Sequence, residues 1–125
     1  MFATMKDRTH ELLLRNIREV FGESNATRRR AAIEELYAED CVLYVPSAMF
    51  VGHEALDQHA GDLRAKHPRS VYTLRSKPQS LHNAGRMPWG SGPPGEPPAQ
   101  TGWDVIIVRD GKIAALYVFL DAMPS

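Results

Sequence analysis

Apolar side chains recur three or four residues apart in three segments of the first half of the chain, a spacing that predicts helices. The first segment is Lys6–Phe21. The second runs from a candidate cap, Asn25, to about Ala38, and the third spans about His53 to Lys66. The predicted buried stripes of these helices are Leu13, Ile17, Val20 and Phe21; Ile33, Leu36 and Tyr37; and Leu56, His59, Ala60 and Leu63.

The other apolar runs are rich in β-branched and aromatic residues and predict strands. They are Cys41–Pro46, Ser70–Lys77, Leu81–Ser91 and the two arms of Thr101–Leu120. Pro88 suits an edge or a bulge, and the run GPPGEPP from Gly92 to Pro98 is predicted to be an exposed tip. Helices near the start and strands at the end favour an α+β fold, in which a curved antiparallel sheet wraps over helices and its concave side makes a pocket.

The hairpin Thr101–Leu120 is the clearest local prediction, because Asp110-Gly111 between apolar runs favours a two-residue type I′ turn. A two-residue loop pairs Arg109 with Lys112 and sets Asp104 opposite Tyr117. Alternation then divides the hairpin into two apolar faces. One face holds Asp104, Ile106, Val108, Ile113, Ala115, Tyr117 and Phe119, and the other holds Trp103, Val105, Ile107, Ala114, Leu116, Val118 and Leu120.

Composition narrows the class of protein. The 125 residues predict a single domain spanning residues 1–125. Fifteen basic and fifteen acidic residues cancel, which argues against nucleic acid as a partner, and the dense run Arg28-Arg29-Arg30 is interpreted as the solvated start of a helix. One cysteine, no apolar run long enough to cross a membrane and no signal-peptide core lead us to expect a cytoplasmic protein that does not bind membranes.

Several chemistries lack their usual motifs. No set of histidine and acidic residues has metal-ligand spacing, and no GxSxG motif marks a hydrolase nucleophile. Gly90, Gly92 and Gly95 lie among prolines rather than between a strand and a helix, so they form no phosphate-binding loop. Cys41 has no neighbour in sequence that would activate it and is interpreted as a buried structural thiol.

Three stretches together resemble the nuclear transport factor 2-like superfamily, and more narrowly its SnoaL-like, polyketide cyclase-like branch. They are RAAIEELYAEDCVLYVP, VGHEALDQHAGDL and GWDVIIVRDGKIAALYVFLD, and the resemblance covers about Asn16 to Asp121. It implies a cone-shaped curved sheet around three helices, an apolar cavity, no cofactor and a homodimer through the outer sheet face. Members of that superfamily include isomerase-, cyclase- and dehydratase-like enzymes as well as proteins that only bind ligands or partners.

The resemblance also suggests which site positions are kept. Isomerase-like members carry a general-base aspartate just before the proline of the first strand, where this chain has Val45. Their tyrosine on the first helix would fall near Asn16 or Ile17 and is also missing. Asp104 matches, to within one residue, the position of an aspartate that lines the cavity in that family.

The candidate catalytic residues are therefore Asp104, His59 and Tyr117. Asp104 would be an acid or base with a pKa raised by apolar surroundings, and it could equally be a structural carboxylate bonded to Tyr117, Trp89 or a backbone amide. His59 could pair with Asp104 or bind a ligand, or could be a histidine at the cavity rim. Tyr117 could stabilise an oxyanion, or could be a core residue.

The predicted ligand-binding residues are Trp89, Val45, Leu43, Leu56, Leu63, Ile106 and Phe119, and the predicted dimer-interface residues are Trp103, Leu116 and Val118.

The leading hypothesis is a cofactor-free pocket protein that performs acid/base chemistry, such as isomerisation, cyclisation or dehydration, on a small apolar or aromatic carbonyl or hydroxyl compound. A non-catalytic ligand-binding or dimerisation module of the same fold is the alternative, and Val45 in place of the usual base supports it. A third possibility is a partner-binding protein like the transport factor itself.

Overall fold

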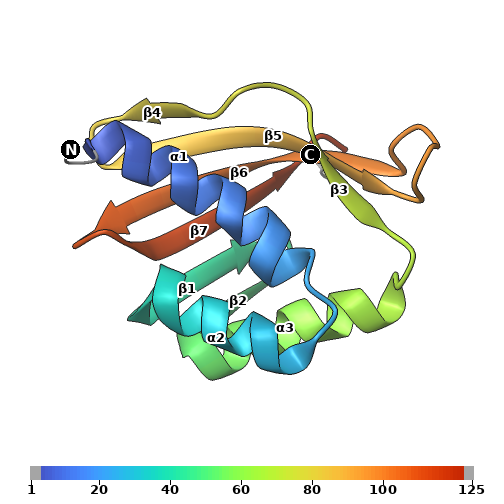
Figure 1. Ribbon diagram of the computed structural model, residues 1–125, viewed down its shortest axis with the longest axis horizontal. Helices are drawn as coiled ribbons and strands as arrows, with labels where there is room; N and C mark the ends of the chain where they lie inside the picture. The colour runs from blue at the N-terminus through green and yellow to red at the C-terminus, as the bar shows by residue number, and fades with distance from the viewer. Residues whose placement is uncertain (1–3, 123–125) are drawn as a thin grey trace.

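Three helices lie on one side of a seven-stranded sheet in the computed structural model, which describes residues 4–122 (Figure 1). The helical elements are α1 (Met5–Arg15), a π-helical segment η1 (Asn16–Phe21), α2 (Ala26–Leu36) and α3 (Gly52–Lys66). The strands are β1 (Tyr37–Val45), β2 (Ala48–Val51), β3 (Val71–Leu74), β4 (Gln79–Leu81), β5 (Ala84–Gly92), β6 (Gln100–Arg109) and β7 (Lys112–Leu120). The predicted α+β class is confirmed. Of the domain predicted for residues 1–125, the first and last three residues lie outside the described range.

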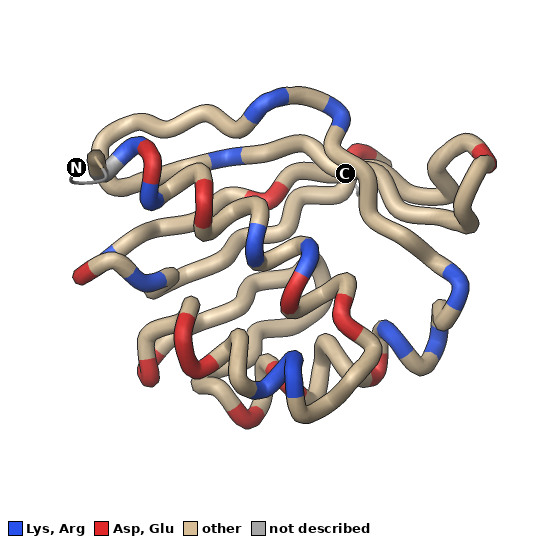
Figure 2. Tube along the Cα trace, viewed as in Figure 1, with Lys and Arg blue, Asp and Glu red and all other residues tan. Residues whose placement is uncertain are grey.

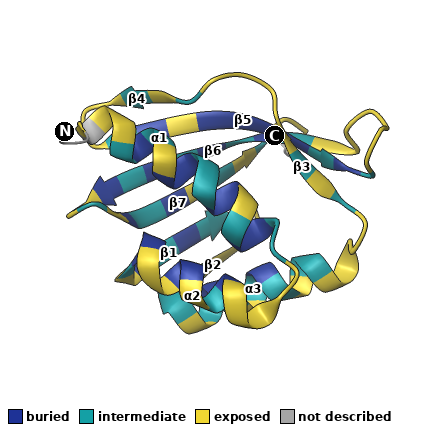
Figure 3. Cartoon of the chain, in the orientation of Figure 1, coloured by how far each residue is buried: buried dark blue, intermediate teal, exposed yellow. Residues whose placement is uncertain are grey.

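The sheet has the strand order β2-β1-β7-β6-β5-β3, and β4 also pairs with β5. β1 and β7 run parallel, and the other pairs are antiparallel. The helices cover the inner face of this sheet, and their inward sides are buried while their outward sides are exposed (Figure 3). The core between the two layers includes Leu12, Leu13, Val20, Ile33, Leu36, Leu43, Leu56, Met87, Ile106, Ile113 and Leu116.

The first helix begins where its sequence supplies a cap. Thr4 and Asp7 form a reciprocal capping box, in which each side chain accepts a hydrogen bond from the other residue's backbone N–H. The predicted helix Lys6–Phe21 continues, but its last six residues are π-helical. π-Helical turns are often found at functional sites. This one buries Asn16 together with Ile17, Val20 and Phe21.

The second predicted helix ends two residues early. Tyr37 is not part of its buried stripe but the first residue of β1, although it is fully buried as expected. The short strands β2 and β4 were not predicted, because four and three residues carry too little alternation to be recognised. The predicted exposed tip Gly92–Pro98 is confirmed for residues 94–98, whereas Gly92 is buried at the end of β5.

The prediction that Pro88 marks an edge strand or a bulge is wrong, because β5 is not an edge strand and its register with β6 is regular at this residue. β3 pairs with residues 89–92 of β5 and β4 pairs with residues 84–86, so Pro88 lies in the gap between them. Its carbonyl accepts a hydrogen bond from Arg75 on this side, and the backbone N of a strand residue points the same way as its carbonyl. The proline nitrogen therefore faces Arg75, just beyond the end of β3, and its missing N–H removes no bond from the ladder between β5 and β6.

The hairpin β6–β7 has the predicted turn but a different register beyond it. Asp110 and Gly111 have φ angles of 52° and 75°, and Arg109 pairs with Lys112 as expected. One extra residue at Ala114 then shifts the pairing, so that Asp104 lies opposite Val118 rather than Tyr117. A shift of one residue turns every following side chain to the other face.

This bulge corrects the predicted faces of β7. Tyr117 and Phe119 point outward, away from the helices, and their side chains are 37% and 48% exposed. Leu116 and Val118 point inward, so the prediction that they form a dimer interface is wrong. Trp103 stays on the outer face as predicted, where the guanidinium of Arg86 lies 4.9 Å from its ring centroid.

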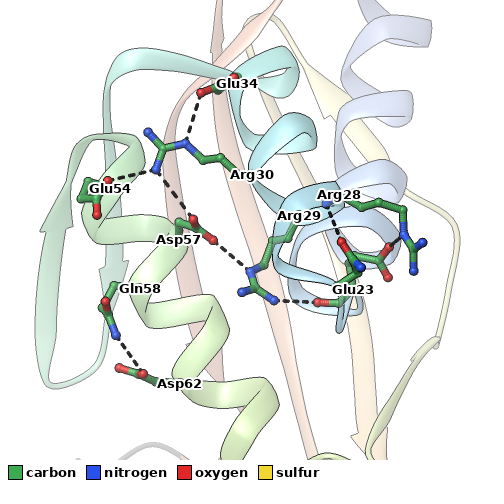
Figure 4. A network of polar contacts seen from close by, with 10 residues as sticks. Glu23, Arg28, Arg29, Arg30, Glu34, Glu54, Asp57, Gln58 and Asp62 are labelled. Atoms are coloured by element: carbon green, nitrogen blue, oxygen red, sulfur yellow. Dashed lines mark hydrogen bonds and ion pairs between the residues drawn. The ribbon is translucent and has the colours of Figure 1, made fainter.

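Charged residues gather on the helices, turns and connecting segments, while most of the sheet is uncharged (Figure 2). A network of ion pairs joins α2 to α3 (Figure 4). The interpretation of the arginine run as solvated is wrong for Arg29, which is only 7% exposed. Its Nε donates to Asp57 at 2.9 Å and its Nη1 donates to the Glu23 carbonyl at 2.9 Å. Arg30 bonds Glu34 and Glu54 at the outer rim of the network.

Replacing Asp57 with Ala is expected to lower the free energy of unfolding by about 2 kcal/mol, because the buried Arg29 guanidinium loses its counter-charge. This expected loss of stability is smaller than for a fully buried ion pair, since the Asp57 side chain is 23% exposed. Arg28→Ala is the matched control, because the Arg28 side chain is 71% exposed, and it should cost less than about 1 kcal/mol. Urea unfolding measures both, and equal losses would contradict a special role for the buried pair.

Candidate active site

A cavity of about 390 Å³ lies between the helices and the inner face of the sheet. This volume is within the range of small-molecule sites. The mouth of the cavity is marked by the lining residues that are exposed to solvent, which are Pro46, Ser47, His67, Ala99 and Gln100. Its deeper walls are formed by Ile17, Phe21, Val45, Leu63, Tyr72, Trp89, Asp104, Val118 and Leu120, and His59, Arg64, Ser70 and Ser91 complete the lining.

Asp104 contributes the only carboxyl group among the lining residues. It lies on the inner face of β6 and is 5% exposed. Its Oδ1 accepts a hydrogen bond from the Trp89 indole N–H at 2.9 Å, and its Oδ2 accepts a long one from the Asn16 amide at 3.5 Å. Burial raises the pKa of Asp104 to about 7, although both hydrogen bonds oppose the shift. The carboxyl group therefore changes its protonation state near neutral pH.

Asn16 and Tyr37 extend this contact into the core. The Tyr37 hydroxyl donates to Asn16 Oδ1, which leaves the Asn16 amide N–H groups to face Asp104. Burial, and secondarily the charge of Asp104, raises the pKa of Tyr37 well above its usual value, so the phenol remains a donor. Asn16 was not predicted as a site residue. It is a polar amide next to the apolar stripe of the first helix, and this feature could have identified it.

Trp89 lies on β5 directly opposite Gly102 of β6. A Cβ atom on Gly102 would lie 2.8 Å from the Trp89 ring, so the absence of a side chain there leaves room for the indole. Tyr72 packs edge-on against the same ring, with centroids 5.6 Å apart. The indole is thus fixed from both sides with its N–H directed at Asp104.

His59 lies on α3 and lines the cavity as expected, but the structure does not show the proposed pair with Asp104. Within residues 4–122, both carboxyl oxygens bond only to Trp89 and Asn16. The His59 ring stacks on Phe50, with centroids 4.4 Å apart. Burial lowers the pKa of His59, so the imidazole is mostly neutral at pH 7.

The structure places the other predicted site residues in three groups. Val45, Leu63 and Trp89 line the cavity. Leu43, Leu56 and Ile106 are fully buried in the core and do not line it. Tyr117 and Phe119 lie on the opposite face of the sheet, where Tyr117 stacks on Tyr44, so the prediction that they face the cavity is wrong.

Some functional candidates were missed by sequence reasoning. Arg64, His67, Ser70 and Tyr72 line the cavity, and they come from the end of α3, the following turn and β3. Arg64 is adjacent in sequence to Leu63, which belongs to the predicted inward stripe of the third helix. This adjacency is the sequence feature that could have identified Arg64 as a cavity residue. In the described part of the chain, no three His, Cys, Asp or Glu side chains are grouped so that they could hold a metal ion. Within the same range, no helix combines the length and the apolar character needed to cross a membrane.

Solved structures match this fold over nearly its full length. A protein of the SnoaL-like family from Agrobacterium tumefaciens, provisionally named an isomerase, gives a TM-score of 0.85 at 22% identity, over 92% of this chain and 98% of that chain. A protein from Jannaschia, provisionally named a SnoaL-like polyketide cyclase, gives 0.78 at 14% identity, over 97% and 90% of the two chains. A nuclear transport factor 2-like protein of unknown function from Mesorhizobium loti gives 0.72 at 22% identity, over 98% of both chains. No protein-family model and no curated protein matches the sequence.

These matches confirm the predicted resemblance at the level of the fold. The chain has the fold of these solved SnoaL-like and nuclear transport factor 2-like proteins, with three helices packed against a mostly antiparallel sheet. The same fold supports many functions, so the activity must be argued from the site.

Proposed function

We propose that the protein binds a small apolar carbonyl or hydroxyl compound in the cavity and that Asp104 exchanges a proton with it. The observation that carries this proposal is a carboxyl group that lines the cavity although it is only 5% exposed, and burial raises its pKa to about 7. A general acid or base is most effective when its pKa lies near the working pH. Isomerisation, aldol-type cyclisation and dehydration all need such a proton transfer beside a carbonyl or hydroxyl group.

The hydrogen bonds of Asp104 fit this role. Trp89 and Asn16 each occupy one acceptor position on a different oxygen, so the carboxylate keeps further acceptor positions for a ligand. Its ionised form can remove a proton from a carbon next to a carbonyl group, and its neutral form can return that proton elsewhere on the same molecule. The neutral imidazole of His59 in the cavity wall can accept or donate a hydrogen bond to the ligand.

Proton exchange of a simple ketone tests the proposal without knowledge of the substrate. The probe is 2-tetralone, an aromatic ketone with acidic protons next to its carbonyl group, and NMR follows their replacement by deuterium in D₂O. The wild type should accelerate the exchange, and the rate should rise through about pH 7 as Asp104 ionises. Asp104→Asn should lower the enzymatic rate by about 100-fold or more. Tyr117→Phe on the outer face is the matched control and should leave the rate unchanged.

The same experiment separates catalysis from binding alone. If 2-tetralone shifts the NMR signals of cavity residues but the wild type does not accelerate exchange, the protein is a ligand-binding module. Exchange that persists undiminished in Asp104→Asn would contradict the role of this carboxyl group.

We infer that the outer face of the sheet pairs with a second copy of the chain. Met49, Val51, Tyr117 and Phe119 are large apolar residues between 37% and 59% exposed, and Trp103 lies on the same face. An exposed apolar patch of this kind is typical of a protein interface. Because the net charge of the chain is zero, two copies have no overall repulsion to overcome.

The dimer predicts a solution mass of twice the 14.0 kDa of the chain, measured by size-exclusion chromatography with light scattering. Phe119→Glu should give monomers, because a charge buried between two apolar faces is strongly unfavourable. Leu74→Glu is the control, since Leu74 is 42% exposed but lies on β3, away from this patch. A monomeric wild type would contradict the inference.

A further inference from the structure

Arg64 differs from most arginines of the described chain because no carboxylate lies within ion-pair distance of it. Arg8, Arg15, Arg28, Arg29, Arg30, Arg75 and Arg109 all form ion pairs. Arg64 instead donates from Nη1 to the Ser70 carbonyl at 2.8 Å, and from Nη2 to Ser24 Oγ at 3.3 Å and the Pro68 carbonyl at 3.4 Å. All three acceptors are neutral.

The Arg64 side chain is also only partly solvated. Its Nε is buried and has no hydrogen-bond partner among the described residues. A guanidinium group that is partly removed from water without a counter-charge is unfavourable unless an anion completes it. The three neutral contacts hold the group in place, so its position is fixed before any ligand arrives.

The Arg64 guanidinium group, which has no ion-pair partner among the described residues, is part of the cavity lining. Arg64 lines it beside His67 and Ser70, where α3 ends and the chain turns toward β3 (Figure 1). Burial, and secondarily the charge of Asp104, raises the pKa of the nearby Tyr72 phenol, and the charge of Arg64 opposes this shift. Asp62, two residues earlier on α3, is exposed and accepts a hydrogen bond from Gln58. Within residues 4–122, Arg64 therefore presents to the cavity a positive charge that no carboxylate contacts, and Asp104 is the one carboxyl group in the same lining.

We propose that the natural ligand is an organic acid whose carboxylate is bound by Arg64 near the mouth while its apolar body lies along Leu63, Trp89 and Val118. The proposal rests on the proposed function and adds the class of substrate to it. Asp104 lines the same cavity as Arg64, so the proton exchange would involve a carbonyl or hydroxyl group of the same bound molecule. A cavity of about 390 Å³ holds an acid with one or two rings.

A matched pair of probes tests the charge requirement. The acid is 2-naphthoate and the neutral analogue is 2-acetylnaphthalene, which has the same rings and an uncharged carbonyl. Calorimetry at pH 6 keeps Asp104 mostly neutral, so it does not repel the acid. The wild type should bind the acid about tenfold more tightly than the ketone, as expected for a charge-assisted hydrogen bond.

Three variants identify the residue responsible. Arg64→Gln should lose the preference for the acid but bind the ketone within about twofold of the wild type, since only the charge-assisted bond is removed. Arg64→Lys keeps the charge and should keep most of the preference. Arg69→Gln removes an exposed cation that does not line the cavity and should change neither affinity.

The possible results separate this inference from the proposed function. Equal affinity of the wild type for both probes would overturn the role of Arg64, and it would leave intact an Asp104-dependent exchange of 2-tetralone. Equal weakening of both probes in Arg64→Gln would also overturn it, because it would show a structural role for the side chain. If neither probe nor 2-tetralone binds in the cavity, both proposals fail.

Discussion

The wild type is expected to lose stability relative to Asp104→Asn as the pH rises from about 4 to 7. In the unfolded chain Asp104 ionises near its usual pKa of 3.8, whereas in the folded protein burial holds its pKa at about 7. Between these values the folded state binds more protons than the unfolded state, so the free energy of unfolding falls with rising pH. A difference of this size corresponds to a loss on the order of 4 kcal/mol, fully developed above pH 7.

Urea unfolding of both proteins at pH 5, 6, 7 and 8 measures this effect. The difference between the two free energies of unfolding matters rather than either value, because the substitution also changes the contact with Asn16. Asp57→Asn is a suitable control, since the partly exposed Asp57 is paired with Arg29 rather than buried alone. A difference between Asp104→Asn and the wild type that stays constant over this pH range would show that the carboxyl group ionises normally in the folded protein.

The architecture could be predicted from sequence because its signals are local and repeated. The helical spacing of Leu13, Ile17 and Val20, and the turn residues Asp110-Gly111, each specify an element without reference to the rest of the chain. The register of β7 could not be predicted in the same way. Both faces of this strand are apolar, so alternation gives no penalty for the extra residue at Ala114. The assignment of Tyr117 and Phe119 to the cavity failed for this reason.

The candidate site was only partly accessible to sequence reasoning. Asp104 could be identified because it is a carboxylate within an apolar strand, and the turn fixes the face of β6. Its partners Trp89 and Asn16 are 15 and 88 residues away in sequence, and only the pairing of β5 with β6 and the packing of η1 bring them to it. Trp89 was predicted as a flat wall for a ligand and also as one possible hydrogen-bond partner of Asp104, and the structure confirms that hydrogen bond.

Gly102→Ala is expected to lower the free energy of unfolding by about 4 kcal/mol, combining overpacking with loss of a buried hydrogen bond to a carboxyl group. A Cβ atom at this position would lie 2.4 Å from the Phe119 carbonyl oxygen and 2.8 Å from the Trp89 ring. The carbonyl belongs to the ladder between β6 and β7 and has little freedom, so the indole must move. Its hydrogen bond to Asp104 would then break.

The loss of that bond has a specific electrostatic consequence. The Trp89 N–H lowers the pKa of Asp104 against the effect of burial, so Gly102→Ala should raise this pKa further above 7. NMR titration of the Asp104 carboxyl carbon measures the change, and denaturant unfolding measures stability. Gly95→Ala is the control, because it has a left-handed φ of 77° but no atom within 4 Å of the added carbon, and it should cost only about 1–2 kcal/mol. If Gly102→Ala is destabilised but the pKa of Asp104 is unchanged, the indole N–H does not help to hold this pKa near neutrality. The pH range in which Asp104 can transfer a proton would then depend on burial and Asn16 alone.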